Sequence, residues 1–220
     1  MSTTPFLDQL DAAKQTDVGI FLIDQFLSTQ QADVAFDILN NDFPWELKPT
    51  LYGQKLSQHA YHYIRNNKSS TKRHIEQSTG LSTLEELCTK IEMQFDGKVS
   101  DVYCNRFQDP KHNIPYHTDT FGKHILVLSL GSTRTVNFRN KKTKQVTSVR
   151  PHAGDLYFMP LRVNDKYEHC VCAASDDDLA SNDTPRLSFV FFIETPKYAK
   201  EYKISKQDKI TGFIEGLLSG

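Results

Sequence analysis

The chain of 220 residues is 38% hydrophobic and 11% aromatic, so it can bury one sizeable core, and we expect a single domain over residues 1–220. Its formal net charge of -1 gives no general attraction for polyanions, so contact with nucleic acid must come from local basic patches. No apolar run reaches the length of a membrane span, and the amino terminus has no signal stretch. We therefore expect an intracellular monomer, in the cytoplasm or nucleus, that contacts no membrane and keeps its thiols reduced.

The first part of the chain predicts two helices. Residues 19–24 are a short apolar run that predicts a strand. Ser28 follows as a helix cap, and apolar residues then recur with a helical period as far as Leu39. A second amphipathic helix is predicted over residues 82–95, with Gly97 ending it.

The remainder of the chain predicts strands. Residues 45–63 lack a clean period and indicate strands and loops, whereas residues 66–73 are polar and basic and indicate an exposed loop. From residue 101 onward the apolar period is two, which is typical of strands. Six strand-like segments follow: 102–107, 125–130, 135–139, 155–159, 168–173 and 186–193. Six strands separated by turn-rich loops predict an α+β, mainly β chain with a jelly-roll core that encloses a small-molecule site.

A candidate metal site lies in this second part. His117 and Asp119 are two apart, so on an extended backbone they point to the same side, and His169 follows about fifty residues later. Two imidazoles and one carboxylate in this arrangement leave open positions on a metal, as in the facial triad of non-haem iron(II) oxygenases. Taken singly, each residue is more often structural, as a loop histidine, a turn former or a satisfied strand residue.

The presence of Arg186 favours the metal site over ordinary structural roles for these three residues. Arg186 stands seventeen residues after His169 at the start of an aromatic strand, where its guanidinium could pair with a carboxylate of a diacid cosubstrate. Asn105 and Phe107 share one face of the strand that leads into the His117 loop, and an amide there could bind an organic acid. The alternative is that Arg186 only ends a strand in an ion pair.

These segments together resemble the AlkB-like iron(II)/2-oxoglutarate dioxygenases, from about residue 21 to residue 193, and look closest to the subgroup that repairs alkylated bases. The strongest matching segments are Asn105-Arg106-Phe107, the His117/Asp119 pair, residues 128–134, 136–139 and 154–156, His169 and Arg186-Leu187-Ser188. The resemblance implies a double-stranded β-helix core over residues 101–193. Helices and an N-terminal substrate-lid extension would occupy residues 19–97, and a C-terminal tail residues 194–220.

The resemblance also implies roles for individual residues. The iron(II) ligands, which are also the catalytic residues, would be His117, Asp119 and His169. The residues that contact 2-oxoglutarate would be Asn105, Phe107, Arg186 and Ser188. The chain departs from the family where the strand R-x-N-x-T-x-R has Ser188, Val190 and Phe192, and where N-x-Y ends in Phe107. A second arginine and a tyrosine hydroxyl are therefore absent, and Arg186 is expected to carry most of the charge pairing.

Residues 49–53, together with Tyr61 and Tyr63, look like the nucleotide-recognition lid of the family. A flipped base is held between flat side chains, and the candidates for this role are Trp45, Tyr52, Tyr61, His62 and Tyr63. Of these, Tyr52, Tyr61 and Tyr63 are predicted to bind substrate. Ordinary packing against a sheet explains any one of these rings equally well.

Local basic clusters could hold phosphates. One comprises Lys68, Lys72 and Arg73, and the other extends from Arg139 to Lys144. Arg139 is the substrate-binding candidate of the second cluster, although this stretch also suits a solvated hairpin turn.

The function implied by the resemblance is oxidative demethylation of alkylated nucleobases, such as 1-methyladenine or 3-methylcytosine, in DNA or RNA. Such a reaction uses Fe(II), 2-oxoglutarate and O2 and releases formaldehyde, succinate and CO2. Two alternatives remain open. One is a 2-oxoglutarate oxygenase that acts on a protein or small molecule, and the other is a non-catalytic cupin-like binding module.

Overall fold

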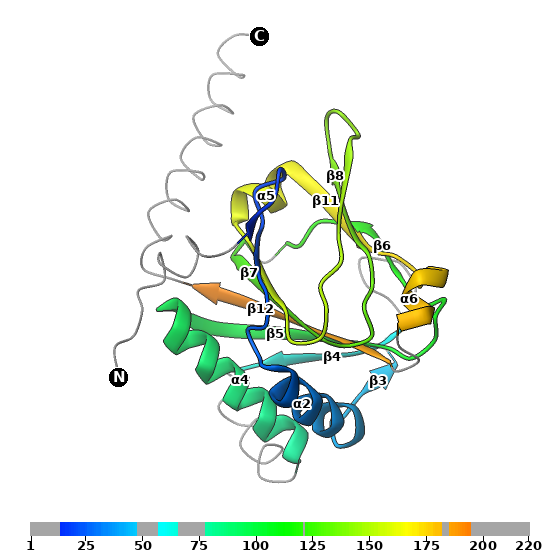
Figure 1. Ribbon diagram of the computed structural model, residues 1–220. Helices are drawn as coiled ribbons and strands as arrows, with labels where there is room; N and C mark the ends of the chain where they lie inside the picture. Colours follow the sequence, from blue (N-terminus) through cyan, green and yellow to red (C-terminus); the bar gives the residue numbers. More distant parts are fainter. Residues whose placement is uncertain (1–13, 48–56, 66–77, 121, 182–184, 195–220) are drawn as a thin grey trace.

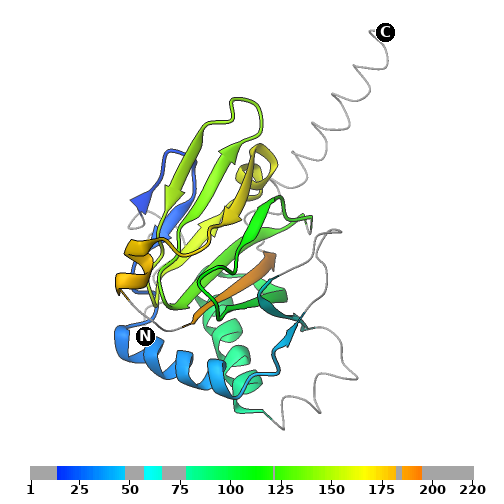
Figure 2. The same cartoon turned by 90° about the vertical axis from the view of Figure 1, so that its right-hand side faces the viewer.

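The computed structural model describes residues 14–47, 57–65, 78–120, 122–181 and 185–194. Two antiparallel sheets face each other, and two helices lie side by side on the outer face of the larger sheet (Figures 1 and 2). This is the mainly β jelly-roll expected from the sequence. Within the described ranges, no helix is both long and apolar enough to cross a membrane.

The larger sheet has eight strands. In spatial order they are β1 (Lys14–Gln15), β2 (Phe21–Ile23), β10 (Leu156–Met159), β7 (His124–Gly131), β12 (Arg186–Glu194), β5 (Lys98–Phe107), β4 (His59–Ile64) and β3 (Glu46–Leu47). The smaller sheet has four, in the order β6 (Ile114–His117), β11 (Tyr167–Val171), β8 (Val136–Asn140) and β9 (Val146–Val149).

Strands β7 and β12 form the centre of the larger sheet and are buried on both faces. Their side chains alternate between two apolar clusters, because successive residues of a strand point to opposite faces. Leu128 and Phe189 belong to the cluster under the helices. Val127 and Phe192 belong to the cluster between the two sheets, which we call the jelly-roll interior. Both faces are covered, so these strands read as continuous apolar runs rather than alternating ones.

The helices α2 (Thr29–Asn41) and α4 (Thr79–Phe95) begin at serine caps. Ser28 accepts a hydrogen bond from the backbone N–H of Gln31, whose side chain returns one to the Ser28 backbone, so this start was correctly predicted. The second helix begins before the predicted residue 82, because the Ser78 side chain accepts from the backbone N–H of Leu81.

Short elements were not predicted individually. They are β6, β9, and the helices α5 (Leu161–Lys166) and α6 (Asp176–Ser181). The acidic stretch at the start of α6 is helical, and within it Asp178 is buried and pairs with Arg150 at 2.6 Å.

Gly131 ends β7 at a positive φ of 73° in close contact with other segments. A Cβ there would lie 2.1 Å from the carbonyl oxygen of Pro185 and 2.6 Å from the Phe36 ring. Gly19 also has a positive φ, 86°, but a Cβ there would meet nothing nearer than a Val163 methyl at 3.6 Å.

We therefore predict that Gly131→Ala lowers the free energy of unfolding by more than about 3 kcal/mol, since backbone strain and steric overlap add. Gly19→Ala introduces only the backbone strain of a positive φ, without steric overlap, and should lower the free energy of unfolding by about 1 kcal/mol. Chemical denaturation of both variants measures the difference. Equal losses would show that the contact with Pro185 and Phe36 is not restrictive.

Candidate active site

The three residues of the candidate metal site come together in the structure. β6 pairs with β11 so that His117 lies opposite His169, with ring centroids 4.3 Å apart. Asp119 follows the end of β6, and its carboxylate oxygens lie 3.9 Å from His117 Nε2 and 3.4 Å from His169 Nε2. In the described part of the chain, this is the one group of three or more His, Cys, Asp or Glu residues able to hold a metal ion.

The two imidazoles are held by their surroundings. His117 Nδ1 lies 2.9 Å from the carbonyl oxygen of Pro115. A carbonyl can only accept, so Nδ1 carries the proton and the Nε2 lone pair faces Asp119. The His169 ring stacks on Phe138 with centroids 5.8 Å apart. Both rings therefore present Nε2 toward the carboxylate, as metal ligands do.

The electrostatics of the group also fit a cation. Burial raises the pKa of Asp119, with His117 opposing that shift. Burial, followed by the charge of His117, lowers the pKa of His169 well below its usual value, so that imidazole is neutral. Asp119 Oδ2 is buried without a hydrogen-bond partner among the described residues. Desolvated lone pairs that converge in this way are stabilised by a divalent cation.

Arg186 offers a matching site for an anion. It is fully buried, and its Nη2 donates to the Ser129 hydroxyl at 3.1 Å. Its Nε and Nη1 have no hydrogen-bond partner within the described ranges. Burial lowers the pKa of the guanidinium to about 10, which still leaves it charged at neutral pH. A buried cation with two unpartnered donor atoms fits an anion such as a carboxylate.

The other expected cosubstrate residues share the sheet face of Arg186. In the pairing of β12 with β5, Phe107 lies opposite Arg186 and Asn105 opposite Ser188. The guanidinium lies 5.3 Å from the centre of the Phe107 ring. Gln58 donates to the side-chain oxygen of Asn105 at 3.2 Å, which fixes the amide. A polar patch beside Arg186 therefore lines the jelly-roll interior.

A family model described as the 2OG-Fe(II) oxygenase superfamily matches residues 19–191, which is more than half of the chain. The chain belongs to this superfamily. It is accordingly a dioxygenase that uses Fe(II) and 2-oxoglutarate, and the resemblance to AlkB-like oxygenases is confirmed at the level of superfamily and fold.

Two individual proteins are also similar to this oxygenase. A solved structure described as "The structure of OsALKBH1" has a TM-score of 0.58 and 14% identity, and the match covers 82% of this chain and 99% of that one. The uncharacterized protein R406 of Acanthamoeba polyphaga mimivirus is 26% identical over 113 residues, which are 50% of this chain and 57% of that protein. The matched region thus spans less than two thirds of the viral protein.

Tyr157 of the oxygenase was not singled out from the sequence. It is buried on the inner face of β10, paired with Val127, and its ring meets Phe138 edge-on at 6.3 Å. Burial raises the pKa of its phenol. The charge of Arg186 lowers this pKa and the charge of Asp119 raises it, so both charged groups lie near the ring. The period of two in residues 155–159 was the only available signal, and it marks a strand rather than a site.

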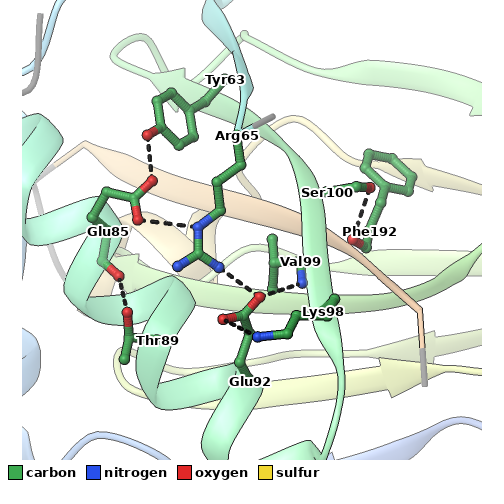
Figure 3. Close-up of polar contacts among 9 residues, drawn as sticks. All are labelled: Tyr63, Arg65, Glu85, Thr89, Glu92, Lys98, Val99, Ser100 and Phe192. Carbon is green, nitrogen blue, oxygen red and sulfur yellow. Dashed lines mark hydrogen bonds and ion pairs between the residues drawn. The ribbon is translucent and has the colours of Figure 1, made fainter. Parts of the chain in front are cut away.

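The structure places Tyr61 and Tyr63 away from the triad. Both belong to the cluster under the helices, on the opposite face of the sheet from the jelly-roll interior. Figure 3 shows Tyr63 donating to Glu85 of α4, which also pairs with Arg65 at 3.0 Å. Tyr63 is buried in that cluster and Tyr61 packs partly buried against it, so the structure gives no support to the expectation that these rings contact a base. Tyr52 lies outside the described residues.

The structure also places Arg139 away from the metal site. On β8 it points to the opposite face from Phe138, pairs with Glu168 at 2.7 Å and lies 3.7 Å over the Tyr116 ring. The expectation that Arg139 binds substrate is therefore not supported, because its side chain is engaged on the outer surface of the smaller sheet. Residues 140–145 form the hairpin turn that was the alternative. Lys68, Lys72 and Arg73 lie outside the described residues.

We predict that Arg186→Met weakens binding of 2-oxoglutarate roughly ten- to a hundredfold, because a charged hydrogen bond is lost. Without cosubstrate the variant should melt at or above the wild-type temperature, since a buried and incompletely paired charge is removed. Calorimetric titration and thermal unfolding, with Mn(II) in place of Fe(II), measure both effects.

Arg134→Met is the matched control. Arg134 is also buried, but it donates to the carbonyl oxygens of Pro110 and Asp109 at 2.7 and 3.2 Å. Its loss should lower the melting temperature and leave the affinity for 2-oxoglutarate unchanged. An affinity of Arg186→Met within twofold of wild type would mean that another group holds the carboxylate.

Proposed function

We propose that the oxygenase removes methyl groups from alkylated nucleobases of DNA or RNA. His117, Asp119 and His169 bind Fe(II). The set that binds 2-oxoglutarate is Arg186, Asn105, Ser188 and Phe107. The observation that carries the cofactor assignment is the convergence of the triad and a buried, incompletely paired guanidinium in one jelly-roll interior. The likeness in fold to OsALKBH1, an AlkB homologue by name, supports the nucleobase as substrate.

The protein's own residues position the reactants. His117, Asp119 and His169 would hold the ion as three protein ligands, and the 2-oxo acid and O2 would react beside them. When bound, Fe(II) supplies oxidation of a C–H bond, coupled to conversion of 2-oxoglutarate and O2 to succinate and CO2. Arg186 orients the distal carboxylate of 2-oxoglutarate, and the apolar side chains around it exclude water. A hydroxylated N-methyl group then leaves as formaldehyde: the N–C bond breaks, the nitrogen keeps its electron pair, and the hydroxyl proton is released.

Two rings, of which His62 is among the candidates expected from the sequence, offer a surface for the substrate base. Tyr103 and His62 lie opposite each other on β5 and β4, with ring centroids 5.7 Å apart. Tyr103 pairs with Val190 of β12, which puts both rings on the face that forms the jelly-roll interior. Both are partly exposed, unlike the buried rings deeper in that interior. Flat side chains where an interior opens to solvent suit an extruded base.

We predict that Tyr103→Ala raises KM for a methylated oligonucleotide roughly tenfold, because a stacked base contributes 1–3 kcal/mol. Tyr61→Ala is the control, since that ring packs under the helices; it should lower the melting temperature without changing KM. Steady-state kinetics at saturating 2-oxoglutarate measures both. An unchanged KM in Tyr103→Ala would contradict this surface.

The second candidate is an oxygenase of a protein side chain or small molecule. The near-neutral net charge favours it, as does the engagement of Arg139 by Glu168 instead of an open basic face. Both candidates use the same triad and cosubstrate, so only the substrate distinguishes them.

The decisive experiment measures succinate and formaldehyde release with and without methylated oligonucleotide. We predict that the methylated oligonucleotide stimulates both products in equal amounts, whereas an unmethylated one does not. Asp119→Ala should abolish turnover, because one of three metal ligands is lost. Turnover that methylated oligonucleotides never stimulate would reject the nucleobase and favour the second candidate.

A further inference from the structure

A buried side-chain amide forms two hydrogen bonds with the backbone of Asp119. The side chain of Asn164, on α5, is 4% exposed. Its Nδ2 donates to the Asp119 carbonyl oxygen at 2.7 Å, and its Oδ1 accepts from the Asp119 backbone N–H at 3.1 Å. One side chain thus satisfies both backbone polar groups of a residue 45 positions away in sequence. Only a primary amide offers a donor and an acceptor in this geometry.

This contact lies beyond the end of β6, where strand pairing no longer fixes the backbone. β6 ends at His117, so the pairing with β11 fixes that histidine but does not extend to Asp119. Asn164 lies five positions before His169, in the segment that runs from α5 directly into β11. The amide therefore joins the loop that carries one ligand to the segment that carries another.

The short helix that carries Asn164 is itself anchored. At its start, the backbone N–H of Leu161 donates to Nδ1 of His124 at 3.2 Å. At its end, Lys141 Nζ donates to the carbonyl oxygens of Asn164 and Asp165 at 3.1 and 2.9 Å. Contacts at both ends hold the amide in place, which a residue on an unsupported turn would not achieve.

We propose that Asn164 is a positioning residue that sets the separation of the metal ligands by holding the backbone of Asp119. The inference rests on the proposed triad. With both hydrogen bonds in place, the Asp119 carboxylate is preorganised opposite the two imidazoles. Without them, the loop must be ordered when the metal binds, and that entropy cost weakens binding.

The test measures Co(II) binding to the metal-free protein, with the visible spectrum of bound Co(II) reporting coordination geometry. Asn164→Ala loses both hydrogen bonds and should weaken Co(II) binding roughly ten- to a hundredfold, with an altered spectrum. Asn164→Asp keeps the size of the side chain and the acceptor but loses the donor, so a carboxylate faces a carbonyl oxygen. It should show the same defect, and it serves as the second variant should Asn164→Ala fail to fold.

Asp155→Ala is the matched control for general destabilisation. The Asp155 side chain is buried and accepts from the backbone N–H groups of Gln25 and His152 at 3.0 and 2.8 Å, at the opposite end of β10 from α5. This variant should lose thermal stability and bind Co(II) within twofold of wild type.

Wild-type Co(II) affinity and spectrum in a folded Asn164 variant would overturn the proposal, as would an equal loss of affinity in Asp155→Ala. Failure of the triad itself gives a different result. In that case wild type and Asp119→Ala bind Co(II) equally, and the Asn164 variants no longer bear on a metal site.

Discussion

The burial of β12 on both faces is the constraint on which the rest of the structure depends. One face carries Phe189 and Phe191 into the core under the helices. The other carries Arg186, Ser188 and Phe192 into the jelly-roll interior. The apolar face fixes the strand, so the polar face can hold a guanidinium that has no complete set of partners among the described residues. Such a group costs stability, and a bound diacid that pairs with it offsets that cost.

The candidate metal site also consists of buried polar groups that the surrounding structure holds without a complete set of partners. Strand pairing places His117 opposite His169, and a buried amide binds the backbone of Asp119, whose carboxylate lies 3.9 and 3.4 Å from the two imidazoles. Burial keeps His169 neutral and leaves Asp119 Oδ2 without a donor in the described structure. The interior thus combines unmatched acceptors at one point with unmatched donors at another. A cation and an anionic cosubstrate would satisfy both sets together, side by side in the jelly-roll interior.

The local parts of this arrangement could be predicted from the sequence, because they depend on spacing along one strand. Because side chains alternate along a strand, the sequence alone places Arg186 and Ser188 on one face. The start of the helix after Ser28 could be predicted from its serine cap. Aromatic density near Tyr61 cannot tell which face of a sheet the rings occupy, so the sequence could not show that this ring packs under the helices. Asn164 and Tyr157 could not be found at all, since their partners are distant in sequence and only the folded chain brings them together.

The measurement that tests the central claim most directly is an anaerobic titration of Fe(II) into the metal-free protein, followed by visible absorption, with and without saturating 2-oxoglutarate. If the interior binds both groups side by side, one Fe(II) binds per chain, and a charge-transfer absorption of the chelated 2-oxo acid develops only when 2-oxoglutarate is present. Succinate, which lacks the 2-oxo group, should not produce it. Fe(II) binding without this absorption at saturating 2-oxoglutarate, or a stoichiometry other than one, would contradict the account.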